Sequence, residues 1–303
     1  MADTAIWPEL DYARWRDTAM TLQLWTQVVG KVRLALTPWV NHSWQVPLYV
    51  TARGLGTSPI PAGHEIVEID FDFIDHSLDL RSSNGAKRAL DLQPQSVAAF
   101  YRAVMAALAE LGVSVRISDM PNEIPGAIRF SQDEEHKAYD AAAARDFWRA
   151  LVQSDHVFKH FRSGFLGKVS PVHFFWGSFD LAVTRFSGRR APPNTGTAPN
   201  VGNWVMREAY SHEVSSVGFW PGDASLPMPA FYAYAYPEPE GFARAPIRPV
   251  GGYYDETMGE FILPYDRLLE DAAPDRCLLE FCETTYAAAA DLGRWNRAEL
   301  ERQ

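Results

Sequence analysis

The chain has 303 residues, of which 47% are hydrophobic and 22% charged, and its formal net charge is −10. A chain of this length can bury a sizeable core, either as one large domain or as two small ones. The net negative charge argues against nucleic acid and against anionic membranes as partners, because both attract proteins through Lys and Arg.

The two cysteines, Cys277 and Cys282, lie on different faces of a predicted helix, which fits a packing role in a reducing compartment. The N-terminus has no basic region followed by an apolar run, and no stretch reaches the roughly 18 apolar residues of a membrane span. We therefore expect a soluble, cytoplasmic protein.

The first half predicts a helix, a group of strands and a second helix. Apolar residues recur at helical spacing in two segments, which are 14–31 and 96–111. The second of these helices stops at Gly112. The predicted strands cover 32–36, 46–51, 66–74, 78–81, 87–92 and 113–117. Segment 66–74 alternates apolar and acidic residues, which is typical of a half-buried strand.

The second half predicts a similar order of elements. Its helices cover 140–161, with Asp140 as the cap, and 275–292. Its strands cover 173–186, 211–219 and 230–236. A linker over 121–139 joins the halves, and a Pro- and Gly-rich loop over 189–203 has no counterpart in the first half. Such a loop is either a cover for a binding site or an irregular excursion.

The two halves also share short segments of similar sequence. Phe100–Gly112 aligns without a gap with Phe281–Gly293, and six of the thirteen positions are identical. His42 precedes a Trp as His173 does, and the pair His64-Glu65 matches His212-Glu213. We therefore predict an α+β fold of two tandem pseudo-repeats, each helix–antiparallel strands–helix. The predicted boundaries are 1–120 and 140–303.

Four sequence blocks resemble an uncharacterised bacterial family, the domain of unknown function 5996. The blocks are Trp25–Leu34, Pro38–His42, Ser170–Asp180 and Tyr210–Val214. The resemblance covers nearly the whole chain, but it implies no activity. Function must therefore be inferred from individual residues.

The two His-Glu pairs are the first candidates for chemistry. Glu213 shares strand parity with Val217 and Phe219, which places it on the covered face of its strand. A carboxylate on such a face must be paired, hydrogen-bonded or protonated. One alternative is a structural ion pair with a nearby Arg, such as Arg53 or Arg185. The other is a general base or metal ligand, for which Glu213 is the stronger candidate and Glu65 the weaker.

The histidines give a second set of candidates. His42 and His173 hold equivalent positions, as do His64 and His212, so the four imidazoles could converge between the halves. Histidine is suited to proton transfer near neutral pH and to metal binding. A divalent metal at His173, His212 or Glu213 stays open, although close ligand spacings are missing. The alternative for His173 is a satisfied core residue among aromatic neighbours.

The second half has the features of a ligand pocket. Ser215, Ser216 and Gly218 are small and leave room on their strand. Aromatic residues that could line a pocket include Trp176, Trp220 and Tyr234. The alternative for the tyrosines is cross-strand packing. Arg185 and Arg53 could anchor an anionic group.

Three functional hypotheses follow. In the first, the protein is an enzyme for a small molecule, either anionic or aromatic, with His173, His212 and Glu213 as acid-base or metal groups. In the second, it is a non-catalytic small-molecule binding protein with the same aromatic pocket. In the third, it is a protein-interaction module whose aromatic residues all lie in the core. The sequence does not indicate the oligomeric state.

Overall fold

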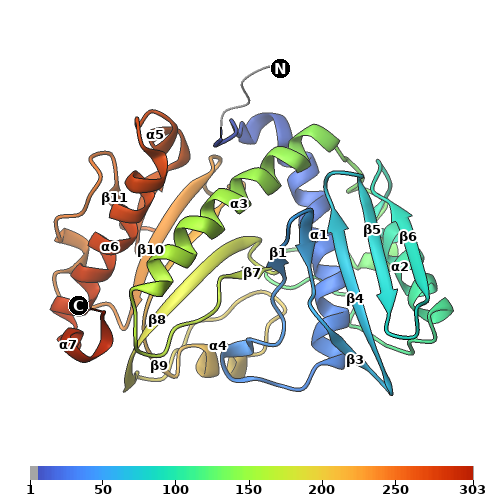
Figure 1. The fold of residues 1–303 in the computed structure, drawn as a ribbon, viewed down its shortest axis with the longest axis horizontal. Coiled ribbons are helices and arrows are strands. Elements are labelled where there is room, and N and C mark those ends of the chain that lie inside the picture. The colour runs from blue at the N-terminus through green and yellow to red at the C-terminus, as the bar shows by residue number, and fades with distance from the viewer. Residues whose placement is uncertain (1–5, 303) are drawn as a thin grey trace.

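The structure is a computed structural model in which residues 6–302 are described. It contains helices and two six-stranded antiparallel sheets, so the predicted α+β class is confirmed (Figure 1). Helix α1 (Tyr12–Leu36) precedes the first sheet and α2 (Val97–Glu110) follows it. Helix α3 (Ala141–Ser163) precedes the second sheet and α6 (Pro274–Leu292) follows it.

The first sheet packs against α1 and α2. Its strands are β1 (Tyr49–Val50), β2 (Gly54–Gly56), β3 (Ile60–Ala62), β4 (Glu65–Asp72), β5 (Ser77–Ser82) and β6 (Lys87–Asp91). They are ordered β1-β2-β4-β5-β6, and β3 also pairs with β4. Phe71 of β4 stacks on Phe100 of α2, which in turn stacks on Trp25 of α1 with ring centroids 4.6 Å apart. These large aromatic groups form the centre of this half.

The second sheet carries α3 and α6 on one face. Its strands are β7 (His173–Phe175), β8 (Asp180–Arg190), β9 (His212–Trp220), β10 (Ala230–Tyr236), β11 (Tyr253–Asp255) and β12 (Glu260–Pro264). They are ordered β11-β12-β10-β9-β8-β7. Figure 1 shows α3 crossing in front of this sheet and α6 lying beside it.

The remaining elements are short. Helix α4 (Asn203–Ala209) follows the Pro- and Gly-rich loop, α5 (Tyr265–Leu269) follows β12, and α7 (Arg297–Leu300) lies near the C-terminus. Three 3-10 turns cover Asn41–Ser43, Phe130–Gln132 and Phe242–Arg244.

One hydrophobic core runs through both halves. The sheets meet where Leu48 and Phe174 exchange two backbone hydrogen bonds of 2.9 Å. Trp148 of α3 also donates its Nε1 hydrogen to the carbonyl of Thr51, at 3.2 Å. The halves are therefore packed together, with the second sheet held against elements of the first half.

Several predicted elements differ from the structure. Residues 32–36 continue α1 rather than forming a strand, because Arg, Leu and Ala favour helix and no breaker occurs before Pro38. Residues 113–117 form no strand, because they pair with neither sheet. The single strand predicted over 173–186 is divided by a turn into β7 and β8. Phe179 in that turn has a positive φ of 62°.

The two repeat segments lie in corresponding places along the chain. Phe100–Gly112 falls in and just after α2, and Phe281–Gly293 falls in and just after α6. Both helices follow a six-stranded antiparallel sheet. The origin of the halves by duplication stays a prediction.

Candidate functional site

A cavity of about 660 Å³ lies on the face of the second sheet that α3 and α6 leave uncovered. Alternate residues of β8 line it, and these are Asp180, Ala182, Thr184 and Phe186. Their neighbours point to the opposite face, as the pleat of a strand requires. The other walls come from α1, segments 39–46 and 122–123, and α4 with the loop before it. The cavity is therefore bounded by both halves of the chain.

The floor of the cavity is rich in hydroxyl groups. Gly218 has no side chain, and a Cβ there would lie 2.3 Å from Cζ of Tyr232. The ring of Tyr232 lies over this glycine, and its hydroxyl donates to the carboxylate of Asp180. Ser178 donates to the other oxygen of Asp180. Both oxygens of this buried carboxylate are thus satisfied, as burial demands.

A second group of hydroxyls continues the floor toward β10. The hydroxyl oxygens of Thr184 and Ser216 are 2.9 Å apart, and those of Tyr210 and Tyr234 are 3.0 Å apart. Each hydroxyl can donate one hydrogen bond and accept others. The floor can therefore orient polar groups of a bound molecule.

Two unpaired carboxylates face the cavity. Glu123, from the segment between the halves, and Glu260, from β12, both line it. Among the described residues, no side-chain hydrogen bond or ion pair is formed by either one. Glu123 is exposed and Glu260 is half-buried at the cavity wall. The surrounding protein atoms, together with the nearby charge of Asp180, raise the pKa of Glu123 and that of Glu260 to about 7.

The cavity lining contains no balancing cation. None of the described residues that line it is Lys or Arg. Five tryptophans line it instead, and these are Trp39, Trp44, Trp176, Trp204 and Trp220. The site is thus a negatively charged, aromatic-walled space.

The Pro- and Gly-rich loop is hydrogen-bonded to the segment that carries Glu123. The amide of Glu123 donates to the carbonyl of Pro199 at 2.7 Å. The side chain of Asn200 donates to the carbonyl of Pro121 at 2.9 Å, and Asn122 donates to the carbonyl of Asn200 at 2.5 Å. These bonds hold Glu123 at the wall, and the end of the loop lines the same cavity.

The structure separates the predicted site residues into two groups. Trp176, Trp220 and Tyr234 line the cavity. His173, His212, Glu213, Arg185 and Arg53 are not part of the lining. Strand parity explains this for Glu213 and Arg185, because they lie on the face of Val217 that the helices cover, and the cavity lies on the other face. His173 and His212 have the parity of the cavity face but lie outside the lining, and Arg53 belongs to the first half. The predicted catalytic and anchoring side chains are therefore not brought together.

Glu213 and Glu65 have hydrogen-bond partners, but not the arginines named as structural partners. Glu213 accepts from Arg189 at 2.6 Å and from Ser187 at 2.8 Å. Glu65 accepts from Ser83. The structural ion pair with a nearby arginine is thus present for Glu213, but the partner is Arg189 rather than Arg53 or Arg185, whose side chains are engaged elsewhere.

Arg185 is buried between aromatic rings. Its guanidinium carbon lies 3.4 Å from the ring centroid of Phe161 and 4.3 Å from that of Tyr286. It donates to the carbonyl of Phe161 and lies 3.5 Å from Glu283. This arginine ties the sheet to α3 and α6, and it is not positioned to anchor a ligand in the cavity.

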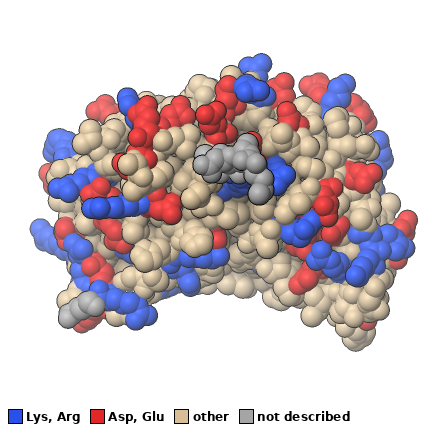
Figure 2. Space-filling model, turned by 45° about the horizontal axis from the view of Figure 1, so that its top comes forward, with Lys and Arg blue, Asp and Glu red and all other residues tan. Residues whose placement is uncertain are grey.

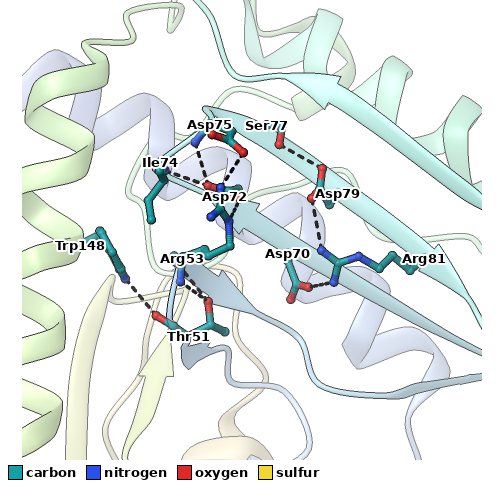
Figure 3. A network of polar contacts seen from close by, with 11 residues as sticks. Thr51, Arg53, Asp70, Asp72, Ile74, Asp75, Ser77, Asp79, Arg81 and Trp148 are labelled. Atoms are coloured by element: carbon teal, nitrogen blue, oxygen red, sulfur yellow. Dashed lines mark hydrogen bonds and ion pairs between the residues drawn. The ribbon is translucent and has the colours of Figure 1, made fainter.

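Arg53 belongs to a surface network of the first sheet (Figure 3). It pairs with Asp72 and with Asp75, the latter at 2.6 Å. Beside it, Arg81 pairs with Asp70 at 2.6 Å and with Asp79 at 3.2 Å. Asp70 and Asp72 of β4 are thus paired with neighbouring arginines.

The histidines do not form one cluster. His173 is buried with neither ring nitrogen bonded, and burial lowers its pKa to about 3, so it stays neutral. His42 lines the cavity, with Nδ1 3.0 Å from the carbonyl of Ala209 and Nε2 2.8 Å from Nζ of Lys168. The rings of His42 and His212 are 6.0 Å apart. Within residues 6–302, no group of three or more His, Cys, Asp or Glu is arranged to hold a metal ion.

Sequence reasoning missed Glu123, Asp180 and Glu260. A signal existed for Asp180, which shares strand parity with Ala182 and Thr184, two small residues of one face. Glu260 lies at the start of a strand that was not predicted, and Glu123 lies in an irregular segment. Neither had a local pattern that pointed to the cavity.

The surface charges are mixed. Figure 2 shows Lys and Arg interspersed with Asp and Glu over one face of the molecule. In the part of the chain that the structure describes, no helix has the length and apolar character needed to cross a membrane.

The comparison with protein families extends the resemblance seen in the sequence blocks. The model of one family matches residues 7–302. The chain belongs to the family of unknown function DUF5996. Comparison with curated proteins gave no match, and comparison with solved structures gave none either. Membership of DUF5996 brings no reaction with it, so the cavity itself must carry the functional argument.

Proposed function

We propose that this protein binds a small organic cation in the cavity between its halves. One observation carries the proposal. The unpaired carboxylates of Glu123 and Glu260 share an aromatic cavity with Asp180, and no Lys or Arg lines it. A protein gains nothing in stability by placing unpaired acids side by side in one cavity without a cation, so their placement favours a ligand that neutralises them.

The walls suit the same ligand chemistry. Tryptophan faces attract ammonium groups through their ring quadrupole, by about 0.5–2 kcal/mol depending on desolvation. The hydroxyls of Thr184, Ser216 and Tyr234 supply hydrogen-bond partners on the floor. A cavity of about 660 Å³ is within the usual range for small-molecule sites.

The proposal changes the ligand charge that the sequence suggested. An anionic ligand depended on Arg53 and Arg185, which are engaged in contacts outside the cavity. The aromatic character of the ligand site is retained through Trp176, Trp220 and Tyr234. We therefore favour an amine or quaternary ammonium compound over a carboxylate or phosphate.

Acid-base catalysis on the bound cation is the second candidate function. It is favoured by two carboxyl groups, Glu123 and Glu260, whose pKa values of about 7 suit proton transfer at neutral pH. Binding and catalysis are distinguished by recovering the bound compound after incubation. Recovery of an unchanged ligand by mass spectrometry supports a binding protein, whereas a transformed product supports an enzyme.

Calorimetry with methylamine, tetramethylammonium and a neutral alcohol of similar size tests the proposal. We expect the two cations to bind at pH 8 and the alcohol not to bind. Glu260→Gln and Glu123→Gln should weaken cation binding at least tenfold. Glu256→Gln is the matched control, because Glu256 is exposed in the turn before β12 and does not line the cavity. Equal binding of the alcohol and the cations would reject the proposal.

We also infer that the two halves are tandem repeats and that the second half provides most of the site. The shared order of helix, antiparallel sheet and helix supports this inference. The net charge of −10 favours a small-molecule partner over nucleic acid. The free, buried cysteines Cys277 and Cys282 favour a cytoplasmic location.

A further inference from the structure

The cavity is long, and its ends differ chemically. Asp180 and Phe186 both line it and are six residues apart on β8, which corresponds to about 20 Å in an extended strand. Glu123 belongs to the Asp180 end, since it lies against Gly177. Glu260 is three strands away from β8, about 14 Å across the sheet. The carboxylates are therefore remote from the corner at Phe186.

The Phe186 corner is apolar and open. His42 packs on Phe186 with ring centroids 4.8 Å apart and contacts the carbonyl of Ala209 at the end of α4. Trp39 is bonded to Glu208 of the same helix, at 2.8 Å. These contacts place Trp39 beside α4, at the Phe186 end of the cavity.

Two tryptophans from different halves meet there. The ring centroids of Trp39 and Trp204 are 4.8 Å apart. Both line the cavity, yet 42% of Trp39 and 57% of Trp204 is exposed. Leu34, also in the lining, is 37% exposed. Large apolar side chains that are both exposed and continuous with a cavity mark a place where a ligand covers them.

A positive charge lies at the same end. The ammonium of Lys168 is 2.8 Å from Nε2 of His42 and lies over the rings of Trp44 and Phe186, at 5.1 and 5.0 Å. A second ammonium group of a ligand would be repelled here, whereas an uncharged tail would not. This end therefore selects against ligands with a cation at both ends.

We propose that the ligand is a monocation with a long apolar tail, whose ammonium lies among the carboxylates and whose tail covers Trp39 and Trp204. This inference rests on the proposed function and narrows its ligand class. It accounts for the exposed tryptophan pair, which a small ammonium ion at the acidic end would leave uncovered.

A series of linear amines tests the inference. Propylamine, hexylamine, decylamine and 1,10-diaminodecane are titrated into the full-length protein at pH 8 by calorimetry, below the concentrations at which they form micelles. We expect affinity to rise about fourfold for each methylene that becomes buried. The diamine should bind at least tenfold more weakly than decylamine.

Variants locate the tail. Trp204→Ala should weaken decylamine binding at least tenfold and weaken propylamine binding much less. Leu34→Ala should act in the same direction. Leu166→Ala is its matched control, because Leu166 is 53% exposed and does not line the cavity. A circular dichroism spectrum of each variant verifies that it is folded.

The outcomes separate the two proposals. If propylamine binds but longer amines bind no better, or if Trp204→Ala does not change decylamine binding, the long-tail inference is overturned and cation binding stands. Tighter binding of the diamine overturns it as well. If none of the amines binds, both proposals fail.

Discussion

Replacing Glu260 by glutamine is expected to stabilise the ligand-free protein at pH 8. In the folded chain, burial and the charge of Asp180 raise the pKa of Glu260 from 4.5 to about 7. In the unfolded chain Glu260 releases its proton near the ordinary glutamate pKa of 4.5. Between these two values the folded state binds more protons than the unfolded state, so the contribution of Glu260 to stability falls as the pH rises. Glutamine has no such proton to lose.

The size of the effect follows from the shift. A pKa that moves from 4.5 to about 7 corresponds to roughly 3 kcal/mol at pH values above both. About 2.5 kcal/mol of this develops between pH 5 and pH 8. Glu260 keeps partial solvent contact, which screens its charge, so we expect a gain of about 1–2 kcal/mol for Glu260→Gln at pH 8.

The assay is urea unfolding followed by tryptophan fluorescence at pH 5 and pH 8. Wild type, Glu260→Gln and the control Glu256→Gln are compared in the absence of ligand. We expect the free energy of unfolding of Glu260→Gln to exceed that of wild type at pH 8 and to differ from it much less at pH 5. The free energy of unfolding of Glu256→Gln should match that of wild type at both pH values. The reasoning is refuted if Glu260→Gln is no more stable than wild type at pH 8.

Three further predictions concern the cavity and the covered sheet face. Methylamine binding should weaken as the pH falls from 8 to 6, because the carboxyls of Glu123 and Glu260, with pKa values of about 7, take up protons; calorimetry at several pH values would contradict this if affinity stayed constant. Gly218→Ala should displace the Tyr232 ring and break its hydrogen bond to Asp180, which should lower the free energy of unfolding in urea by about 1–3 kcal/mol. An unchanged free energy of unfolding would show that the ring can move without loss of stability. Glu213→Gln should lower the free energy of unfolding by about 1 kcal/mol, because Arg189 and Ser187 lose a charged acceptor, and it should leave methylamine binding unchanged. Loss of methylamine binding in the folded variant would show that Glu213 takes part in the binding site.

The sequence by itself determined the elements with strong local patterns. Alternation along β4 and the cap Asp140 are local signals, and the structure has these elements where they were predicted. Local patterns also separated the two faces of β9, since parity is a property of the strand alone. They also indicated that the face of Glu213, Val217 and Phe219 is covered, but they could not show which segments of the chain lie against the opposite face, because those contacts form only when the chain folds.

Only the tertiary structure decided the site. The small face of β9, with Ser216 and Gly218, became the cavity floor, and the face of Glu213 became the interface with the helices. The carboxylates of Glu123, Asp180 and Glu260 come from distant positions, and no local spacing relates them. The surrounding protein and the charge of Asp180 raise the pKa values of Glu123 and Glu260, and both causes are properties of the assembled cavity. The positive charge that we propose for the ligand therefore depends on long-range contacts between the two halves, which no single segment of the sequence contains.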